Sequence, residues 1–153
     1  MAFREPTFSA QIYLLNKRIR YRIEKKVIEF RVEQIQLIGE YTAPPRLLPA
    51  DYFFSFKLRG IDQMVDVPAY AEGLFDEVLP GLRKLLPGVG QSKLQMCHEL
   101  ASNVLYPAHV YGLDMFRFRE VQRPLVDLPV LRRIGHTNKV ERTLNPEVLS
   151  AVF

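Results

Sequence analysis

Three segments between residues 18 and 58 alternate polar and apolar side chains, and this alternation limits the possible folds more than any other feature of the sequence. The segments span residues 18–24, 27–32 and 52–58. Successive side chains of a β-strand point to opposite faces of a sheet, so each segment has one face for a core and one for solvent. The pattern predicts a curled antiparallel sheet at the start of the molecule.

Additional strands are predicted at residues 8–15, 36–41 and 63–67. Asn16-Lys17 is a plausible turn that joins the first of these strands to the arginine-rich segment as a hairpin. The apolar positions change parity after Val32, and this change predicts a tight turn or a bulge at Glu33-Gln34.

Two helices are predicted after these strands. In the first, Leu74, Val78 and Leu82 recur at helical spacing, and Pro68 suits the first helical turn. Pro80-Gly81 interrupts this pattern, because a proline inside a helix removes a hydrogen bond and clashes with the preceding turn. We therefore expect a kink or two short helices.

The second helix is predicted to start at a capping box in residues 92–95 and to end before Pro107. Its apolar stripe contains Leu94, Cys97, Ala101 and Val104. A returning strand at residues 113–121 follows and could rejoin the sheet.

The sequence pattern weakens from Pro124 onward, where Asn145-Pro146-Glu147 suits only a short terminal helix. Residues 124–131 are apolar and bounded by prolines, a composition typical of a segment laid across another surface. That surface belongs either to the same chain or to a neighbour. The candidate contact residues are Leu125, Leu128, Val130 and Leu131.

These elements predict an α+β protein: a curled antiparallel sheet of five to seven strands, two main helices and an irregular C-terminal tail. A chain of 153 residues suits one core, so residues 1–123 are predicted to form a single domain. Residues 124–153 are predicted to be a tail that packs on this domain or on a partner.

The composition favours a cytoplasmic protein. No apolar run approaches the roughly 20 residues of a membrane span, and the start of the chain lacks an apolar region suited to secretion. The single cysteine, Cys97, forms no internal disulfide, which agrees with a reducing compartment.

The sequence indicates no catalytic residue, metal site or cofactor. Cys97 and His98 are adjacent, and adjacent residues on a helix do not face each other, so Cys97 is predicted to pack in the core. The three histidines lack zinc-site spacing. Residues 87–93 lack the Gly-Lys-Ser/Thr order of a phosphate-binding loop and are explained by a helix end and a helix start.

The strongest positive signal is the row of Arg18, Arg20 and Arg22. Alternate residues of a strand lie about 6.6 Å apart, close to the spacing of backbone phosphates. Tyr21 points to the opposite face, so it does not interleave with these charges as a stacking platform. A solvated strand face that discourages edge pairing is the simpler interpretation.

Three functions remain open. The first is a non-enzymatic binding or assembly domain that associates with itself through the sheet and the tail. The second is a binder of nucleic acid or of an acidic lipid surface through Arg18, Arg20 and Arg22. The third is an enzyme for a small molecule, with a cleft between sheet and helices lined by Glu40, Asp51 or His109.

Overall fold

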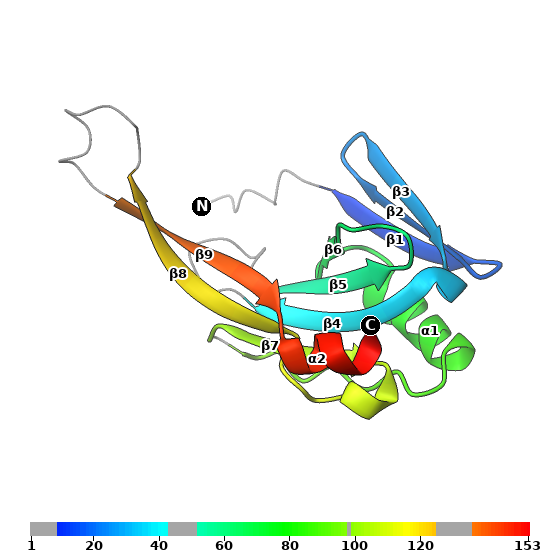
Figure 1. Ribbon diagram of the computed structural model, residues 1–153. Helices are drawn as coiled ribbons and strands as arrows, with labels where there is room; N and C mark the ends of the chain where they lie inside the picture. Colours follow the sequence, from blue (N-terminus) through cyan, green and yellow to red (C-terminus); the bar gives the residue numbers. More distant parts are fainter. Residues whose placement is uncertain (1–8, 43–51, 98, 125–135) are drawn as a thin grey trace.

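The structure is a computed structural model that describes residues 9–42, 52–97, 99–124 and 136–153 (Figure 1). Its described strands form antiparallel sheets of three, four and two strands, and it contains two α-helices. The elements are β1 (Ala10–Leu15), β2 (Arg18–Ile23), β3 (Lys26–Arg31), β4 (Ile35–Thr42), β5 (Tyr52–Leu58), β6 (Val65–Pro68), α1 (Leu79–Leu85), β7 (Ala101–Tyr106), β8 (Phe116–Pro124), β9 (His136–Leu144) and α2 (Pro146–Val152).

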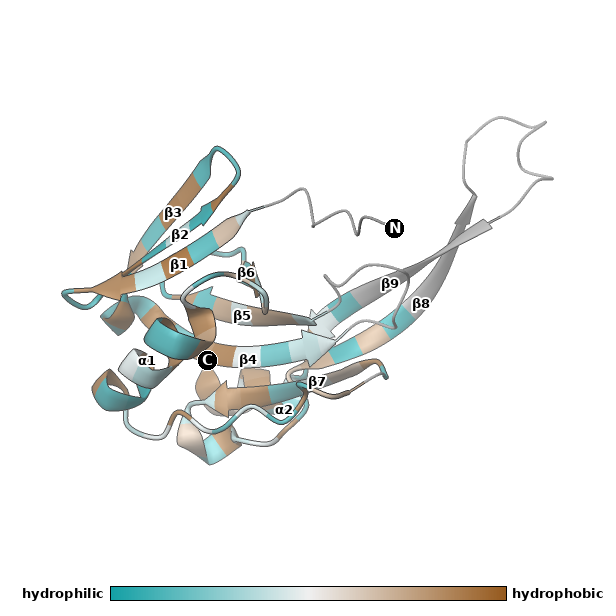
Figure 2. Ribbon diagram, turned by 180° about the vertical axis from the view of Figure 1, so that it is seen from behind, coloured by the Kyte–Doolittle hydropathy of each residue, from teal (hydrophilic) through white to brown (hydrophobic). Residues whose placement is uncertain are grey.

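The first sheet has the order β1-β2-β3, and tight two-residue turns set its register. Asn16 and Lys17 occupy the first turn with φ angles of 50° and 62°, as turns that match the twist of a hairpin require. This confirms the predicted hairpin. Buried and exposed residues alternate along most of β1 and β2, and hydrophilic residues are interspersed with hydrophobic ones in all three strands (Figure 2).

The second sheet has the order β6-β5-β4-β7. A 3₁₀-helix at Val32–Gln34 precedes β4, which confirms the predicted turn. The pairing of β4 with β5 shifts between Ile35 and Leu37. Because of this bulge, Ile35 faces one hydrophobic cluster and Leu37 faces the other, so both faces of β4 are buried.

The first predicted helix is present in two parts. A π-helical turn at Leu74–Val78 leads directly into α1. Pro80 lies in the first turn of α1, a position that tolerates a residue without a backbone N–H. Leu74, Val78 and Leu82 are buried, as predicted. The role of Pro68 was predicted wrongly, because this residue ends β6 instead of starting a helix.

The second predicted helix is wrong, because residues 101–106 form β7 and pair with β4. Both faces of β7 are covered, and its four central residues are all buried. A strand that is buried on both faces shows no alternation of polar and apolar residues, so its apolar residues can fit the spacing expected of a helix. In the expected capping box, the N–H groups of Lys93 and Leu94 donate to a buried carboxylate instead.

The expectation of a single sheet with an irregular C-terminal tail is also wrong. β8 pairs with β9 along nine residue pairs, and the resulting two-stranded ribbon extends away from the body (Figure 1). The short terminal helix is confirmed as α2, which Asn145 caps by accepting a hydrogen bond from the Glu147 N–H. The division at residue 123 stays a prediction.

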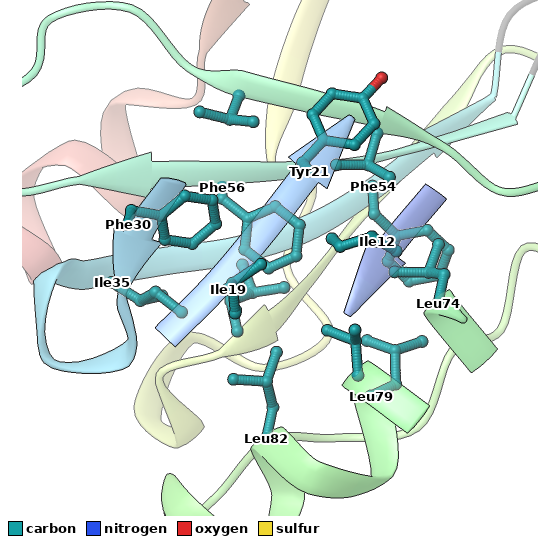
Figure 3. Close-up of a cluster of buried hydrophobic side chains, with 14 of the residues drawn as sticks. Ile12, Ile19, Tyr21, Phe30, Ile35, Phe54, Phe56, Leu74, Leu79 and Leu82 are labelled. Carbon is teal, nitrogen blue, oxygen red and sulfur yellow. The ribbon is translucent and has the colours of Figure 1, made fainter. Parts of the chain in front are cut away.

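The main core lies between the two larger sheets and α1 (Figure 3). Ile12, Ile19, Tyr21 and Phe30 come from the first sheet. Phe54 and Phe56 face them from β5, and Leu74, Leu79 and Leu82 cover the side of the cluster. The opposite face of the four-stranded sheet holds a second cluster that includes Leu37, Val104, Met115, Phe116 and Val148.

Gly39 lies at the centre of β4, where the second cluster approaches the backbone closely. A Cβ atom at this position would overlap with the Met115 Sδ and lie 3.0 Å from the Asn103 carbonyl oxygen. We expect Gly39→Ala to lower the free energy of unfolding by about 1–3 kcal/mol, measured by urea denaturation, because the core must move to admit the methyl group.

The double variant Gly39→Ala/Met115→Ala is the matched control for this cost. The alanine at position 115 leaves room for the new methyl group, so the effect of Gly39→Ala should shrink in the Met115→Ala background. An equal cost in both backgrounds would contradict the proposed overlap.

Candidate anion-binding face

The three predicted arginines lie together on the solvent-exposed face of the first sheet. Ile19 and Tyr21 point from β2 into the core, so Arg18, Arg20 and Arg22 point outward. These arginines belong to a surface that we call the Arg face, which consists of the exposed side chains Tyr13, Arg18, Arg20, Arg22, Glu29 and Arg31. Four arginines and one glutamate give this face a net charge of +3.

Glu29 forms ion pairs with two arginines of the Arg face, and Arg31 pairs with the neighbouring Glu33 at 3.1 Å. The Glu29 carboxylate lies 3.5 Å from the Arg18 Nη1 and 3.7 Å from the Arg20 Nε. Both arginines are more than half exposed, so each ion pair contributes at most about 1 kcal/mol. Because these ion pairs are weak, an anion that binds more tightly than the Glu29 carboxylate can reach the guanidinium groups.

The Arg face also carries an aromatic ring that the sequence analysis missed. Tyr13 of β1 lies opposite Arg20, is 38% exposed and accepts a hydrogen bond of 3.2 Å from the Arg20 Nη1. This hydrogen bond, followed by electrostatic interaction with Tyr13 and Glu29, raises the pKa of Arg20 above its usual value. The charged Arg20 thus has an aromatic ring directly beside it.

Three shallow cavities border the Arg face, and Arg18 lines each of them. The cavity beside Tyr13, Leu15 and Arg20 has a volume of about 460 Å³. A second, of about 420 Å³, lies between the β1–β2 turn and the end of α1 and includes Lys17 and Arg31. The Arg face is thus hollowed around its cationic groups.

The predicted tail contacts Leu125, Leu128, Val130 and Leu131 lie outside the described residues and stay predictions. Asp51, one of the candidate cleft residues, also lies outside them.

Glu40, another candidate cleft residue, is fully buried at the centre of β4. Its Oε1 accepts hydrogen bonds from the Lys93 and Leu94 N–H groups at 2.7 and 3.2 Å and from the Asn103 Nδ2 at 3.1 Å. Tyr52 donates to Oε2 at 2.5 Å. Four donors offset the cost of burying this carboxylate, which therefore anchors the loop before β7 to the sheet.

A second polar cluster connects the base of the ribbon to the four-stranded sheet. Asp66 forms an ion pair with Arg142 and accepts hydrogen bonds from Ser55 and Tyr41. The Arg142 guanidinium lies 4.3 Å from the centroid of the Tyr41 ring and 5.0 Å from that of Phe116. Asp66 therefore has a structural role between the four-stranded sheet and the ribbon.

The other reactive side chains do not form a site within the described residues. Cys97 is half-buried outside any helix, and its Sγ lies 3.5 Å from the Glu99 carbonyl oxygen. The exposed His109 has its Nε2 3.0 Å from the Ala151 carbonyl oxygen. No group of three His, Cys, Asp or Glu side chains in the described ranges is arranged to hold a metal ion.

Among the residues that the structure describes, no helix combines the length and the apolar character that crossing a bilayer requires. Comparison of the chain with protein-family models, with curated proteins and with solved structures finds no match.

Buried tyrosines make the stability of the fold sensitive to alkaline pH. Burial, followed by the proximity of Tyr70 and Asp66, raises the pKa of Tyr21 to about 12. Burial also raises the pKa values of Tyr41 and Tyr52. A raised pKa means that the folded state keeps its proton after the unfolded chain, with a pKa of about 10, has lost it.

The stabilisation from Tyr21 is therefore complete below pH 10 and declines as the pH rises toward 12. We expect Tyr21→Phe to reduce the loss of unfolding free energy across this window, measured by urea denaturation at pH 9, 10 and 11. Identical pH dependence in the variant and the wild type would contradict this assignment.

Proposed function

We propose that this chain is a non-enzymatic binding domain and that the Arg face is its surface for an anionic polymer. The observation that carries the proposal is the placement of Arg18, Arg20 and Arg22 in one exposed row on a rigid sheet. Such a surface attracts polyanions by charge, and a rigid scaffold limits the entropy lost on binding.

A single-stranded nucleic acid is the polyanion that the Arg face suits best. The row of guanidinium groups can follow a phosphate backbone, and the Tyr13 ring beside Arg20 offers a surface on which a base can stack. An acidic lipid surface is the alternative ligand, since it needs only the charges. The two ligands differ in whether Tyr13 contributes.

We expect Arg18→Gln/Arg20→Gln/Arg22→Gln to weaken binding of a fluorescent single-stranded oligonucleotide, measured by anisotropy at several salt concentrations. Three lost phosphate contacts should reduce the slope of log affinity against log salt by about 2. Arg59→Gln/Lys84→Gln/Arg117→Gln is a charge-matched control, because these three exposed residues lie outside the Arg face. Equal losses in both triple variants would contradict a defined binding face.

Two single substitutions sharpen this test. Glu29→Gln removes the carboxylate that competes for Arg18 and Arg20, so oligonucleotide affinity should rise by about two- to fivefold. Tyr13→Leu should weaken oligonucleotide binding and leave binding to phosphatidylserine vesicles unchanged. Vesicle binding without oligonucleotide binding would favour the lipid alternative.

A second candidate function, self-association, is favoured by the ribbon of β8 and β9. The ribbon leaves the body as a pair of strands, whereas hairpins generally need a third strand or a packed face for independent stability (Figure 1). A neighbouring copy could supply that support, and residues 124–131 belong to the same part of the chain.

The ribbon can be shortened without removing its anchor. Replacing residues 120–140 by Asn-Gly joins the paired residues Arg119 and Glu141 through a tight turn and keeps Arg142 and α2. We expect the full chain to sediment as an oligomer and the shortened variant as a monomer. Two monomeric species would reject self-association through the ribbon.

A further inference from the structure

The outer edge of β3 presents backbone hydrogen-bonding groups that no described residue uses. In the β2–β3 ladder, hydrogen-bonded pairs alternate with non-bonded pairs, and the 2.9 Å bond from the Val32 N–H to the Lys17 carbonyl continues this alternation. The backbone of Ile28 therefore faces β2. The N–H and C=O groups of Val27 and Glu29 point away from the sheet.

The two edges of this sheet differ. On the β1 side, the backbone of Glu72 donates to the Ala10 carbonyl at 2.9 Å and accepts from the Ile12 N–H at 2.8 Å. At the end of β3, the side chain of Gln34 accepts from the Arg31 N–H at 2.9 Å. On β3, the groups of Val27 and Glu29 form the open part of the edge, between the β2–β3 turn and the covered Arg31 N–H.

We propose that this edge binds an extended acidic peptide, which adds to β3 as a fourth, antiparallel strand. The backbone groups of Val27 and Glu29 would supply four hydrogen bonds, as in other cases of strand addition. Lys25 and Lys26 lie at one end of the edge and Arg31 at the other, and all three are exposed. Arg31 already forms an ion pair of 3.1 Å with Glu33, so Lys25 and Lys26 supply most of the preference for acidic residues, and a peptide carboxylate opposite Arg31 has to compete with Glu33.

The side chains of β3 define the order of residues in the peptide. Ile28 is half-buried at the margin of the core and Phe30 is buried, so the peptide residues opposite them should be apolar. A second carboxylate directly opposite Glu29 would be repelled, whereas a threonine there can donate a hydrogen bond. The sequence Glu-Val-Thr-Val-Glu meets these requirements, with its first residue opposite Arg31 and its last opposite Val27.

A second copy of β3 is a poorer occupant than this peptide. The antiparallel register that pairs Val27 with Glu29 of another copy places Lys25 opposite Arg31 at both ends of the new pair. Like charges in directly opposite positions destabilise a sheet. Lysines on an edge strand also discourage pairing between identical chains.

The test is an NMR titration of the full chain, at physiological salt, with the blocked peptide Ser-Glu-Val-Thr-Val-Glu-Ser. The largest shifts should occur at the Val27 and Glu29 amides. A methyl group on the threonine nitrogen blocks a bond to β3 and should weaken binding by about tenfold or more. The same methyl group on either valine nitrogen points away from β3 and should be tolerated.

Variants of the chain separate this edge from the Arg face. Val27→Pro removes an N–H that the β2–β3 ladder does not use, so the sheet should persist while peptide binding is lost. Arg18→Gln/Arg20→Gln/Arg22→Gln should keep peptide affinity within about threefold, because β2 lies more than a Debye length from the added strand. The peptide and oligonucleotide experiments can thus fail independently.

Three results would overturn the proposal. The first is equal binding of the threonine-methylated and valine-methylated peptides. The second is loss of peptide binding in the triple arginine variant with retention in Val27→Pro. The third is a dimer of the free chain that Val27→Pro dissolves, because a second copy would then occupy the edge.

Discussion

The packing of the first sheet against the four-stranded sheet and α1 is the interaction on which the other features depend. Phe30 and Phe56 meet with ring centroids 5.7 Å apart, and Ile19 is fully buried beside them. Because alternate residues of β2 face opposite ways, burying Ile19 and Tyr21 requires that the arginines between them face solvent. A shift of the register by one residue would place three guanidinium groups in the core, at a cost far above the stability of a domain of this size. The Arg face is therefore a direct consequence of core formation.

Buried and half-buried polar groups connect the remaining elements to this framework. Glu40 holds the loop before β7 through hydrogen bonds to backbone and side-chain donors, and Asp66 holds the base of the ribbon through Arg142. Removing a donor from the fully buried Glu40 would weaken the compensation of its carboxylate, whereas Asp66 and Arg142 are partly exposed and their separation would cost less. Because their polar atoms are engaged in these contacts, Glu40 and Asp66 act as structural anchors. The proposed binding surfaces lie elsewhere, on the exposed side of the first sheet and along its edge.

The face and the edge of that sheet offer different kinds of recognition. The face offers charge and one aromatic ring, which suits a polyanion and makes binding sensitive to salt. The edge offers backbone donors and acceptors, which suit an extended peptide in a defined register. Both surfaces use the same rigid strands, yet Arg20 belongs to the first and Val27 to the second. The two binding activities can therefore be separated by substitution.

Local sequence determined the first hairpin, the turn after Val32, β5, the helical segment from residue 74 and the capped helix α2. Each of these segments carries a local signal in its alternation, its helical spacing or its turn chemistry, and β5 keeps its apolar alternation although Ser55 on its other face is also buried. The sequence did not reveal β7, which is buried on both faces, or β9, whose partner β8 lies in the ribbon outside the two larger sheets. It identified Arg18, Arg20 and Arg22 as one row, but only the pairing of β1 with β2 placed Tyr13 beside Arg20. Strand pairing and the choice of which edge stays open depend on contacts between residues distant in the chain, such as Ile12 with Glu72, and these contacts leave no local pattern in the sequence.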